Sequence, residues 1–133
     1  MRNEGAKLFI WDFHGTLEQG NEHAVIAFSN IALEAMGFLE RFRDADVERL
    51  YGRPWFEYFS DLLPHLAHEV HVALQTQSYA LNATHWHIIE RHIRPTAHSM
   101  DVLAQIAQAG HDQVLISNTE QDSLLKFVDT VGM

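Results

Sequence analysis

Two short polar clusters, each directly after an apolar run, carry the residue types that could do chemistry. Asp12 opens the segment DFHGTL (12–17) and places a carboxylate at the end of the first run. Ser117 and Asn118 add a hydroxyl and an amide at the end of the second run. A helix is expected to begin near Thr119–Glu120, where its free N–H groups and positive dipole end would attract an anion. Together these groups suit a phosphate or a carboxylate.

The two apolar runs predict neighbouring strands of one parallel sheet. Lys7–Asp12 is rich in strand formers and predicts a strand buried on both faces, and Asp112–Ile116 predicts a second short strand. A helical pattern that opens at Arg94 and closes at Gly110 connects them, which implies parallel pairing. Parallel strands end at the same edge of a sheet, so Asp12 and Ser117 are expected to meet there.

A long helical block separates the two clusters. Helices are predicted over 21–36, 44–51, 55–63, 66–81 and 84–92, and again from residue 122 onward. The fold class is therefore α/β, with a Rossmann-like core formed by residues 1–19 and 93–133 and an α-helical insertion formed by residues 20–92. Glu18 and Gln19 stand where the chain leaves for the insertion and are candidates for a hinge.

Composition narrows the classes of partner. The 133 residues hold nine Lys and Arg against eighteen Asp and Glu, a formal charge of -9, so nucleic acid and membrane partners are not expected. The absence of cysteine excludes disulfides, thiol catalysis and thiolate metal sites. The first residues lack an apolar signal core, and no apolar run approaches the ~18 residues of a membrane span. A cytoplasmic protein is expected.

The order of motifs resembles the haloacid dehalogenase-like hydrolase superfamily. The segment LFIWDFHGTL (8–17) is similar to its first signature, an apolar strand followed by Asp-x-Asp-Gly-Thr-Leu. The segment VLISN (114–118) is similar to its second, an apolar strand that ends in Ser or Thr. The helical block resembles the first-type cap, which this family inserts after the first motif.

The resemblance implies a phosphomonoesterase that acts on a small soluble phosphate through an aspartyl-phosphate. Asp12 would be the nucleophile. Mg²⁺ would be bound by the Asp12 carboxylate and by the backbone carbonyl of His14. Gly15 and Thr16 would shape the phosphoryl pocket. Finally, Ser117 and Asn118 would hydrogen-bond the transferring group.

Position 14 departs from the family pattern. His14 stands where the phosphatases of the family carry a second Asp, the general acid and base. Acid–base help of this kind is typically worth ~10²–10⁴ in rate. Two readings stay open: the imidazole of His14 performs the proton transfer, or the site is impaired or has other chemistry. We expect His14→Asp in a longer form of the chain to raise phosphatase turnover.

A second departure lies beyond the second motif. The family's third-motif cation and fourth-motif acidic pair have no counterpart before Met133. The sequence therefore predicts a fragment or truncated hydrolase with little or no turnover. The first strand would then have an exposed edge, with Phe9 and Trp11 uncovered. A homodimer could cover that edge.

Two alternatives to the phosphatase stay open. One is a metal-independent 2-haloacid dehalogenase, in which the Asp12 carboxylate displaces halide from carbon. The other is a non-catalytic protein that keeps the fold and binds a ligand or partner.

Histidines gather in the helical block. His65, His68 and His71 are spaced three apart, and His85 and His87 follow. Helical spacing brings imidazoles onto one face, as in some metal sites. No carboxylate or cysteine completes a tetrahedral set, so these histidines are predicted to be solvated.

Overall fold

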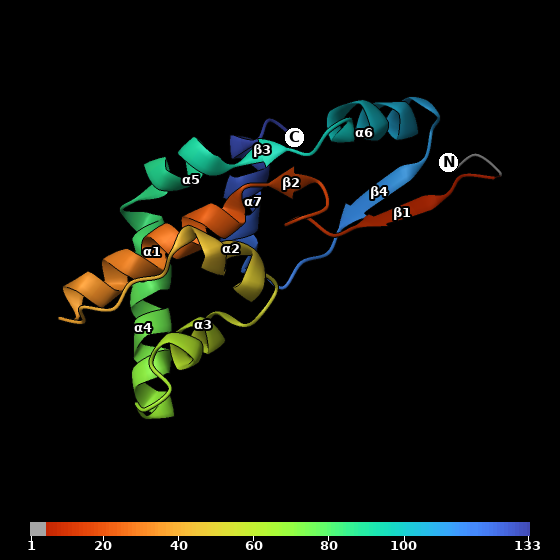
Figure 1. The fold of residues 1–133 in the computed structure, drawn as a ribbon. Coiled ribbons are helices and arrows are strands. Elements are labelled where there is room, and N and C mark those ends of the chain that lie inside the picture. The colour runs from red at the N-terminus through yellow and green to blue at the C-terminus, as the bar shows by residue number, and fades with distance from the viewer. Residues whose placement is uncertain (1–4) are drawn as a thin grey trace. The chain divides into compact units, whose positions relative to one another are not determined.

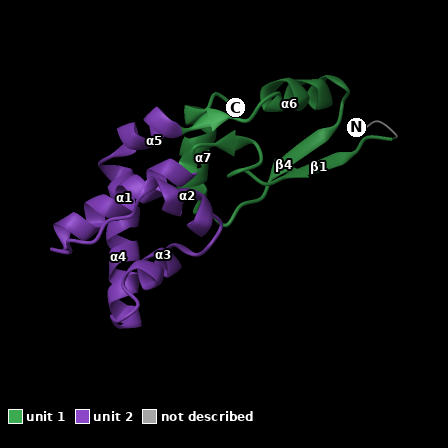
Figure 2. Ribbon diagram, in the orientation of Figure 1, with its two compact units in different colours: residues 1–21, 93–133 green, residues 22–92 purple. Residues whose placement is uncertain are grey.

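The computed structural model describes residues 5–133 and divides the chain into two compact units (Figures 1 and 2). Unit 1 combines the N-terminal segment up to Asn21 with Ile93–Met133, and unit 2 is Glu22–His92. The sequence interpretation places the two boundaries after residues 19 and 92, and residues 1–4 of its core segment lie outside the described residues. Both polar clusters lie in unit 1.

Unit 1 contains the expected parallel pair of strands. β1 (Leu8–Trp11) pairs with β4 (Asp112–Leu115) in parallel, and Trp11 stands opposite Leu115. Helix α6 (Ser99–Gln108) precedes β4 in the chain. Gln113 ties the three elements together: its Oε1 accepts from the Trp11 indole N–H at 3.0 Å, and its Nε2 donates to the Leu103 carbonyl of α6 at 3.0 Å. The predicted parallel pairing of these two segments is confirmed.

The burial expected for β1 is wrong. Its residues alternate between exposed and half-buried, because successive side chains of a strand point to opposite faces. Phe9 and Trp11 are half-buried on the face of Gln113, where the Phe9 ring lies 5.8 Å from that of His111. The opposite face is apolar and exposed, at Leu8 (55%), Ile10 (61%), Val114 (41%) and Ile116 (60%). Leu8 and Ile10, and not Phe9 and Trp11, are therefore the uncovered side chains of β1.

A second, very short pairing joins the ends of the two chain segments of unit 1. β2 (Glu18–Gln19) pairs antiparallel with β3 (Arg94–Pro95), with Glu18 opposite Pro95. The sequence predicts a helix from Arg94, and this start is wrong: α6 begins at Ser99 after His98, whose φ of 66° is left-handed. Two-residue strands have no periodicity, so only pairing across the fold reveals them. The last helix, α7, spans Gln121–Thr130.

Unit 2 is helical throughout its regular structure. It contains α1 (Asn21–Ala35, from the last residue of unit 1), α2 (Asp44–Leu50), α3 (Trp55–Leu62), α4 (His68–Ala80), the 3-10 helix η1 (Leu81–Ala83) and α5 (Trp86–His92). These bounds agree with the predicted helices to within a few residues. Its core is formed by buried apolar side chains from several helices, including Leu33, Leu50, Phe59 and Leu74. Burial also raises the pKa of Tyr58 to about 12.

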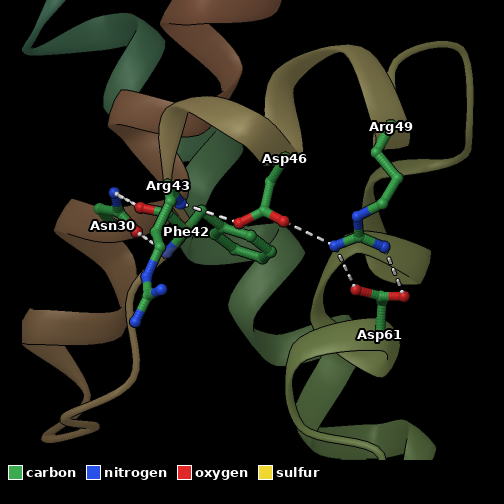
Figure 3. A network of polar contacts seen from close by, with 6 residues as sticks. All are labelled: Asn30, Phe42, Arg43, Asp46, Arg49 and Asp61. Atoms are coloured by element: carbon green, nitrogen blue, oxygen red, sulfur yellow. Dashed lines mark hydrogen bonds and ion pairs between the residues drawn. The ribbon is translucent and has the colours of Figure 1, made fainter.

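Side-chain hydrogen bonds link α1 to the segment before α2, and α2 to α3, within unit 2 (Figure 3). The Asn30 side chain accepts from the Phe42 N–H at 2.8 Å and donates to its carbonyl at 3.2 Å. The Arg49 guanidinium donates to both carboxylate oxygens of Asp61, at 2.8 and 2.9 Å, and to Asp46 at 2.6 Å. The pKa of Asp46 is lowered by the Arg43 backbone N–H and then by Arg49, and that of Asp61 by Arg49.

The prediction of solvated histidines in this unit is wrong for His71. Its side chain is buried, and its Nε2 lies 2.7 Å from the Leu63 carbonyl oxygen, which makes it a core hydrogen-bond donor. His65 and His68 are exposed as expected. Within residues 5–133, no group of three His, Cys, Asp or Glu side chains is arranged to hold a metal ion. In the same range, no helix has the length and apolar character needed to span a bilayer.

Candidate active site

The carboxyl ends of β1 and β4 place the two polar clusters at one edge of the sheet. The ladder continues one step past the strands, because the Ile116 N–H donates to the Trp11 carbonyl at 2.9 Å. Asp12 and Ser117 therefore follow directly on neighbouring strands that run in the same direction. This edge is where parallel α/β sheets bind their ligands.

A tight loop carries the first cluster away from β1. The Phe13 carbonyl accepts from the N–H groups of Thr16, Leu17 and Glu18, at 3.1, 3.0 and 3.2 Å. Gly15 permits this turn because its φ of 81° is left-handed, a region that a side chain disfavours. Phe13 is fully buried and anchors the loop. Hydrogen bonds within its own backbone therefore close this loop.

Asp12 is exposed at the rim of this loop. Its Oδ2 lies 3.5 Å from the Thr16 hydroxyl, which can donate to it. Thr96 supports the same loop from the β3 side: its hydroxyl donates to the Thr16 carbonyl at 2.7 Å, and its N–H donates to the Leu17 carbonyl at 2.9 Å. The carboxylate is accessible, as a nucleophile or a metal ligand must be.

The His14 side chain turns toward the interior of unit 1. Its Nδ1 lies 2.6 Å from Oε2 of Glu18, whose side chain is fully buried. The ring makes T-shaped contacts with Phe127 of α7, with 4.7 Å between centroids, and with Phe13, with 5.2 Å. The imidazole is therefore fixed by one hydrogen bond and two aromatic contacts.

The second cluster forms a turn of its own after β4. The Ser117 hydroxyl accepts from the Thr119 N–H at 3.1 Å, and Asn118 is exposed. The expected open helix N-terminus is wrong: the Glu120 side chain accepts from the N–H groups of Asp122 and Ser123, both at 3.3 Å. These hydrogen bonds lower the pKa of Glu120, led by those from Ser123. The protein's own carboxylate occupies the place where an anion was predicted.

The structure thus brings the predicted residues to one rim without joining them. Among the described residues, no hydrogen bond links Asp12 to Ser117, and each bonds within its own turn. Asp12, Gly15 and Thr16 share one loop, and Ser117 and Asn118 share the adjacent one.

The donors at this rim suit a hard cation such as Mg²⁺. This ion is commonly held by one or two carboxylates and a substrate phosphate and keeps several waters, so it needs no closed protein cage. The Asp12 carboxylate is exposed, and His14 has a backbone carbonyl in the same loop. The Nδ1 atom of His14 is already hydrogen-bonded to Glu18 and is not a candidate ligand for the ion. The candidate ligands from this loop are therefore both oxygen atoms.

The partner of His14 is not predicted from the sequence. The sequence indicates Glu18 only as a hinge candidate, although a carboxylate four positions after a histidine in a tight loop is a usable signal. Phe127 has no predicted role, because nothing in the order of residues indicates that α7 contacts this loop. Both assignments depend on the tertiary structure.

No model of a protein family matches the sequence, and no curated protein does. Several solved structures match the fold. A haloacid dehalogenase-like family hydrolase from Streptococcus pneumoniae has a TM-score of 0.73 and 10% identity over 97% of this chain and 57% of its own. CbbY from Rhodobacter sphaeroides, in complex with phosphate, has a TM-score of 0.65 and 17% identity over 94% and 56%.

A third match has the same character. A family IA, variant 3 hydrolase of this superfamily from Entamoeba histolytica has a TM-score of 0.65 and 12% identity over 94% of this chain and 54% of its own. The chain therefore spans little more than half the length of the structures it matches. At these identities the likeness is one of architecture. The expected fold is confirmed: this chain has the α/β fold of the haloacid dehalogenase-like hydrolases, with a helical segment inserted after the first strand.

Proposed function

We propose that this chain carries the nucleophile half of a phosphomonoesterase site, with Asp12 as the nucleophile. The single observation that carries the proposal is the exposed Asp12 carboxylate at the end of β1, on the strand next to β4, which leads into the turn with Ser117. Unit 2 would be the cap that selects the substrate, a small phosphate ester in solution.

The proposed reaction has two steps, and its atoms balance. An Asp12 oxygen forms a bond to phosphorus as the ester P–O bond breaks, and the leaving oxygen takes a proton from His14. Water then attacks the same phosphorus, gives a proton back to His14, and releases phosphate and the free carboxylate. Each step needs a proton carrier, and His14 is the titratable side chain two residues from Asp12.

The remaining residues bind and orient. The Thr16 hydroxyl, 3.5 Å from Oδ2 of Asp12, would keep that oxygen from rotating. Ser117 and Asn118 would donate hydrogen bonds to the phosphoryl oxygens. Mg²⁺, when bound through Asp12 and the His14 carbonyl, would offset the repulsion between the carboxylate and the phosphate.

The test is transfer of a phosphoryl group to Asp12. The chain is incubated with p-nitrophenyl phosphate and Mg²⁺, quenched in acid and weighed intact by mass spectrometry. We expect a species heavier by one phosphoryl group, absent from Asp12→Asn and from samples with a chelator. Asp129→Asn, an exposed acid in α7, is the matched control and should behave as the unaltered chain.

The two alternatives predict different results when a 2-haloacid is also offered as substrate. Halide release from a 2-haloacid that resists a chelator would instead indicate the dehalogenase. If Asp12→Asn changes neither phosphoryl transfer nor halide release, the protein is a non-catalytic binder, and the proposed function is wrong.

A further inference from the structure

Glu18 is a fully buried carboxylate that the proposed reaction does not use. Its exposed fraction is 0%, and burying a charge is costly unless each oxygen has a partner. Both oxygens have one: Oε2 lies 2.6 Å from His14 Nδ1, and Oε1 accepts from the Asn21 N–H at 2.9 Å. The two contacts use different oxygens, so the carboxylate has a defined orientation.

The contact with Asn21 identifies Glu18 as a hydrogen-bond acceptor. Asn21 is the first residue of α1, and its backbone N–H can only donate, so Oε1 of Glu18 accepts from it. With Oε2 as an acceptor as well, the proton of the short contact lies on Nδ1 of His14, and in the neutral ring Nε2 is the nitrogen without a proton.

The fold sets the position of this carboxylate independently of His14. Glu18 lies in β2, opposite Pro95 of β3, and the Gly15 N–H donates to the Glu18 carbonyl at 2.8 Å. The T-shaped contact with Phe127 limits rotation of the His14 ring. The side chain of His14 retains 20% exposure, so the ring is not sealed from solvent.

We propose that Glu18 is the positioning residue of His14: it holds the proton on Nδ1 and leaves Nε2 to exchange a proton with the leaving oxygen and with water. This inference rests on the proposed function, because it assigns the atom through which His14 would act. The family pattern has a carboxylate at position 14, where this chain has His14. Here a carboxylate stands four residues later, at Glu18, and contacts the imidazole.

The first test reads the tautomer and needs no activity. Long-range ¹H–¹⁵N spectra of the histidine-labelled protein are recorded at about pH 9, where an ordinary imidazole is neutral. We expect His14 to carry its proton on Nδ1. Two internal controls should show the opposite form: His111 accepts from the Lys7 N–H at Nδ1, and His71 bonds the Leu63 carbonyl through Nε2.

Glu18→Gln reverses the arrangement without changing the shape of the side chain. Its amide oxygen would take the place of Oε1 and accept from Asn21, so its NH₂ group would face Nδ1 and donate to it. The His14 proton should then move to Nε2. Phosphoryl release should fall about 10²-fold in kcat with KM unchanged, because Nε2 can no longer accept a proton.

Two controls separate positioning from a merely structural role. Glu120→Gln alters another carboxylate that accepts from a helix N-terminus and should leave both the His14 tautomer and kcat unchanged. In a His14→Ala background, Glu18→Gln should cause no further loss of kcat.

The outcomes are distinguishable. A proton on Nε2 of His14 in the unaltered chain overturns the inference, whatever the activity. Unchanged kcat in Glu18→Gln also overturns it. If His14 carries its proton on Nδ1 but Asp12 is never phosphorylated, the proposed function fails and the assignment of the His14–Glu18 pair stands.

Discussion

His14 shows how one exchange changes what a loop can do. From the sequence, His14 removes a general acid and base, because an imidazole stands where the resemblance places a carboxylate. In the structure, His14 is paired with Glu18, because Nδ1 lies 2.6 Å from that buried carboxylate. An acid at this position would face Glu18 directly. For His14→Asp in this chain we therefore expect lower turnover, whereas the sequence alone predicts higher turnover in a longer form of the chain.

We predict that His14→Asp lowers both activity and stability. Two carboxylates at this distance cannot both be charged in a buried setting, so one must be protonated or move. The variant should lose ~1–3 kcal/mol of unfolding free energy and about 10²-fold in kcat. Urea denaturation and release of p-nitrophenol measure the two effects. His14→Asp combined with Glu18→Val should recover stability, and a single variant faster than the unaltered chain would contradict the prediction.

Among the helices of unit 2, one side-chain hydrogen bond links α1 to α3. The Trp55 indole N–H donates to the Ser29 hydroxyl at 2.7 Å, and that hydroxyl also donates to the Val25 carbonyl of its own helix at 2.7 Å. Ser78 in α4 is the useful comparison. It is equally buried, but its hydroxyl donates only to the Leu74 carbonyl of its own helix, at 2.8 Å.

We predict that the two serines differ when each is changed to alanine. Ser29→Ala leaves the Trp55 N–H without its partner and should cost ~1–2 kcal/mol in the free energy of unfolding. Ser78→Ala removes only a bond within one helix and gains helix propensity, so its cost should stay below ~0.5 kcal/mol. Urea unfolding followed by tryptophan fluorescence measures both, and equal costs would show that the Trp55 contact contributes nothing.

The whole molecule carries an uncovered apolar sheet face. Leu8, Ile10, Val114 and Ile116 lie on the same side of the β1–β4 pair, and each is more than two-fifths exposed. Contiguous exposed apolar surface of this kind favours association. Among the described residues, β1 pairs only with β4, so its other edge is available for pairing as well.

We predict that the chain self-associates through this face. Sedimentation velocity should show a weight-average mass that rises above 15.3 kDa with concentration. Ile10→Lys should shift the protein toward the monomer, because a charge on this face opposes its burial. Leu39→Lys is the control: Leu39 lies in unit 2 and is 91% exposed, and its change should have no effect. A monomer at every concentration would contradict the prediction.

The periodic parts of this fold are readable from the sequence. The apolar runs at 8–11 and 112–115 and the helical spacing of 21–35 each depend on neighbours along the chain, which is why these elements could be predicted. The pairing of β2 with β3 could not be, because it joins two residues to two others more than seventy positions away. Burial of His71 could not be predicted either. His71 has the same spacing as its exposed neighbour His68, and only the packing of α4 against other residues distinguishes the two.

By itself the sequence determined that a carboxylate and a hydroxyl would follow two parallel strands, since a crossover helix between two apolar runs permits little else. Only the tertiary structure decided how those groups are engaged. In the structure the Ser117 hydroxyl accepts a hydrogen bond within its own turn, and the Glu120 side chain caps the N-terminus of α7. The Glu18 carboxylate is hydrogen-bonded to the imidazole of His14. Strand order follows from local pattern, whereas hydrogen-bond partners follow from which polar groups the packed elements bring within hydrogen-bonding distance of each other.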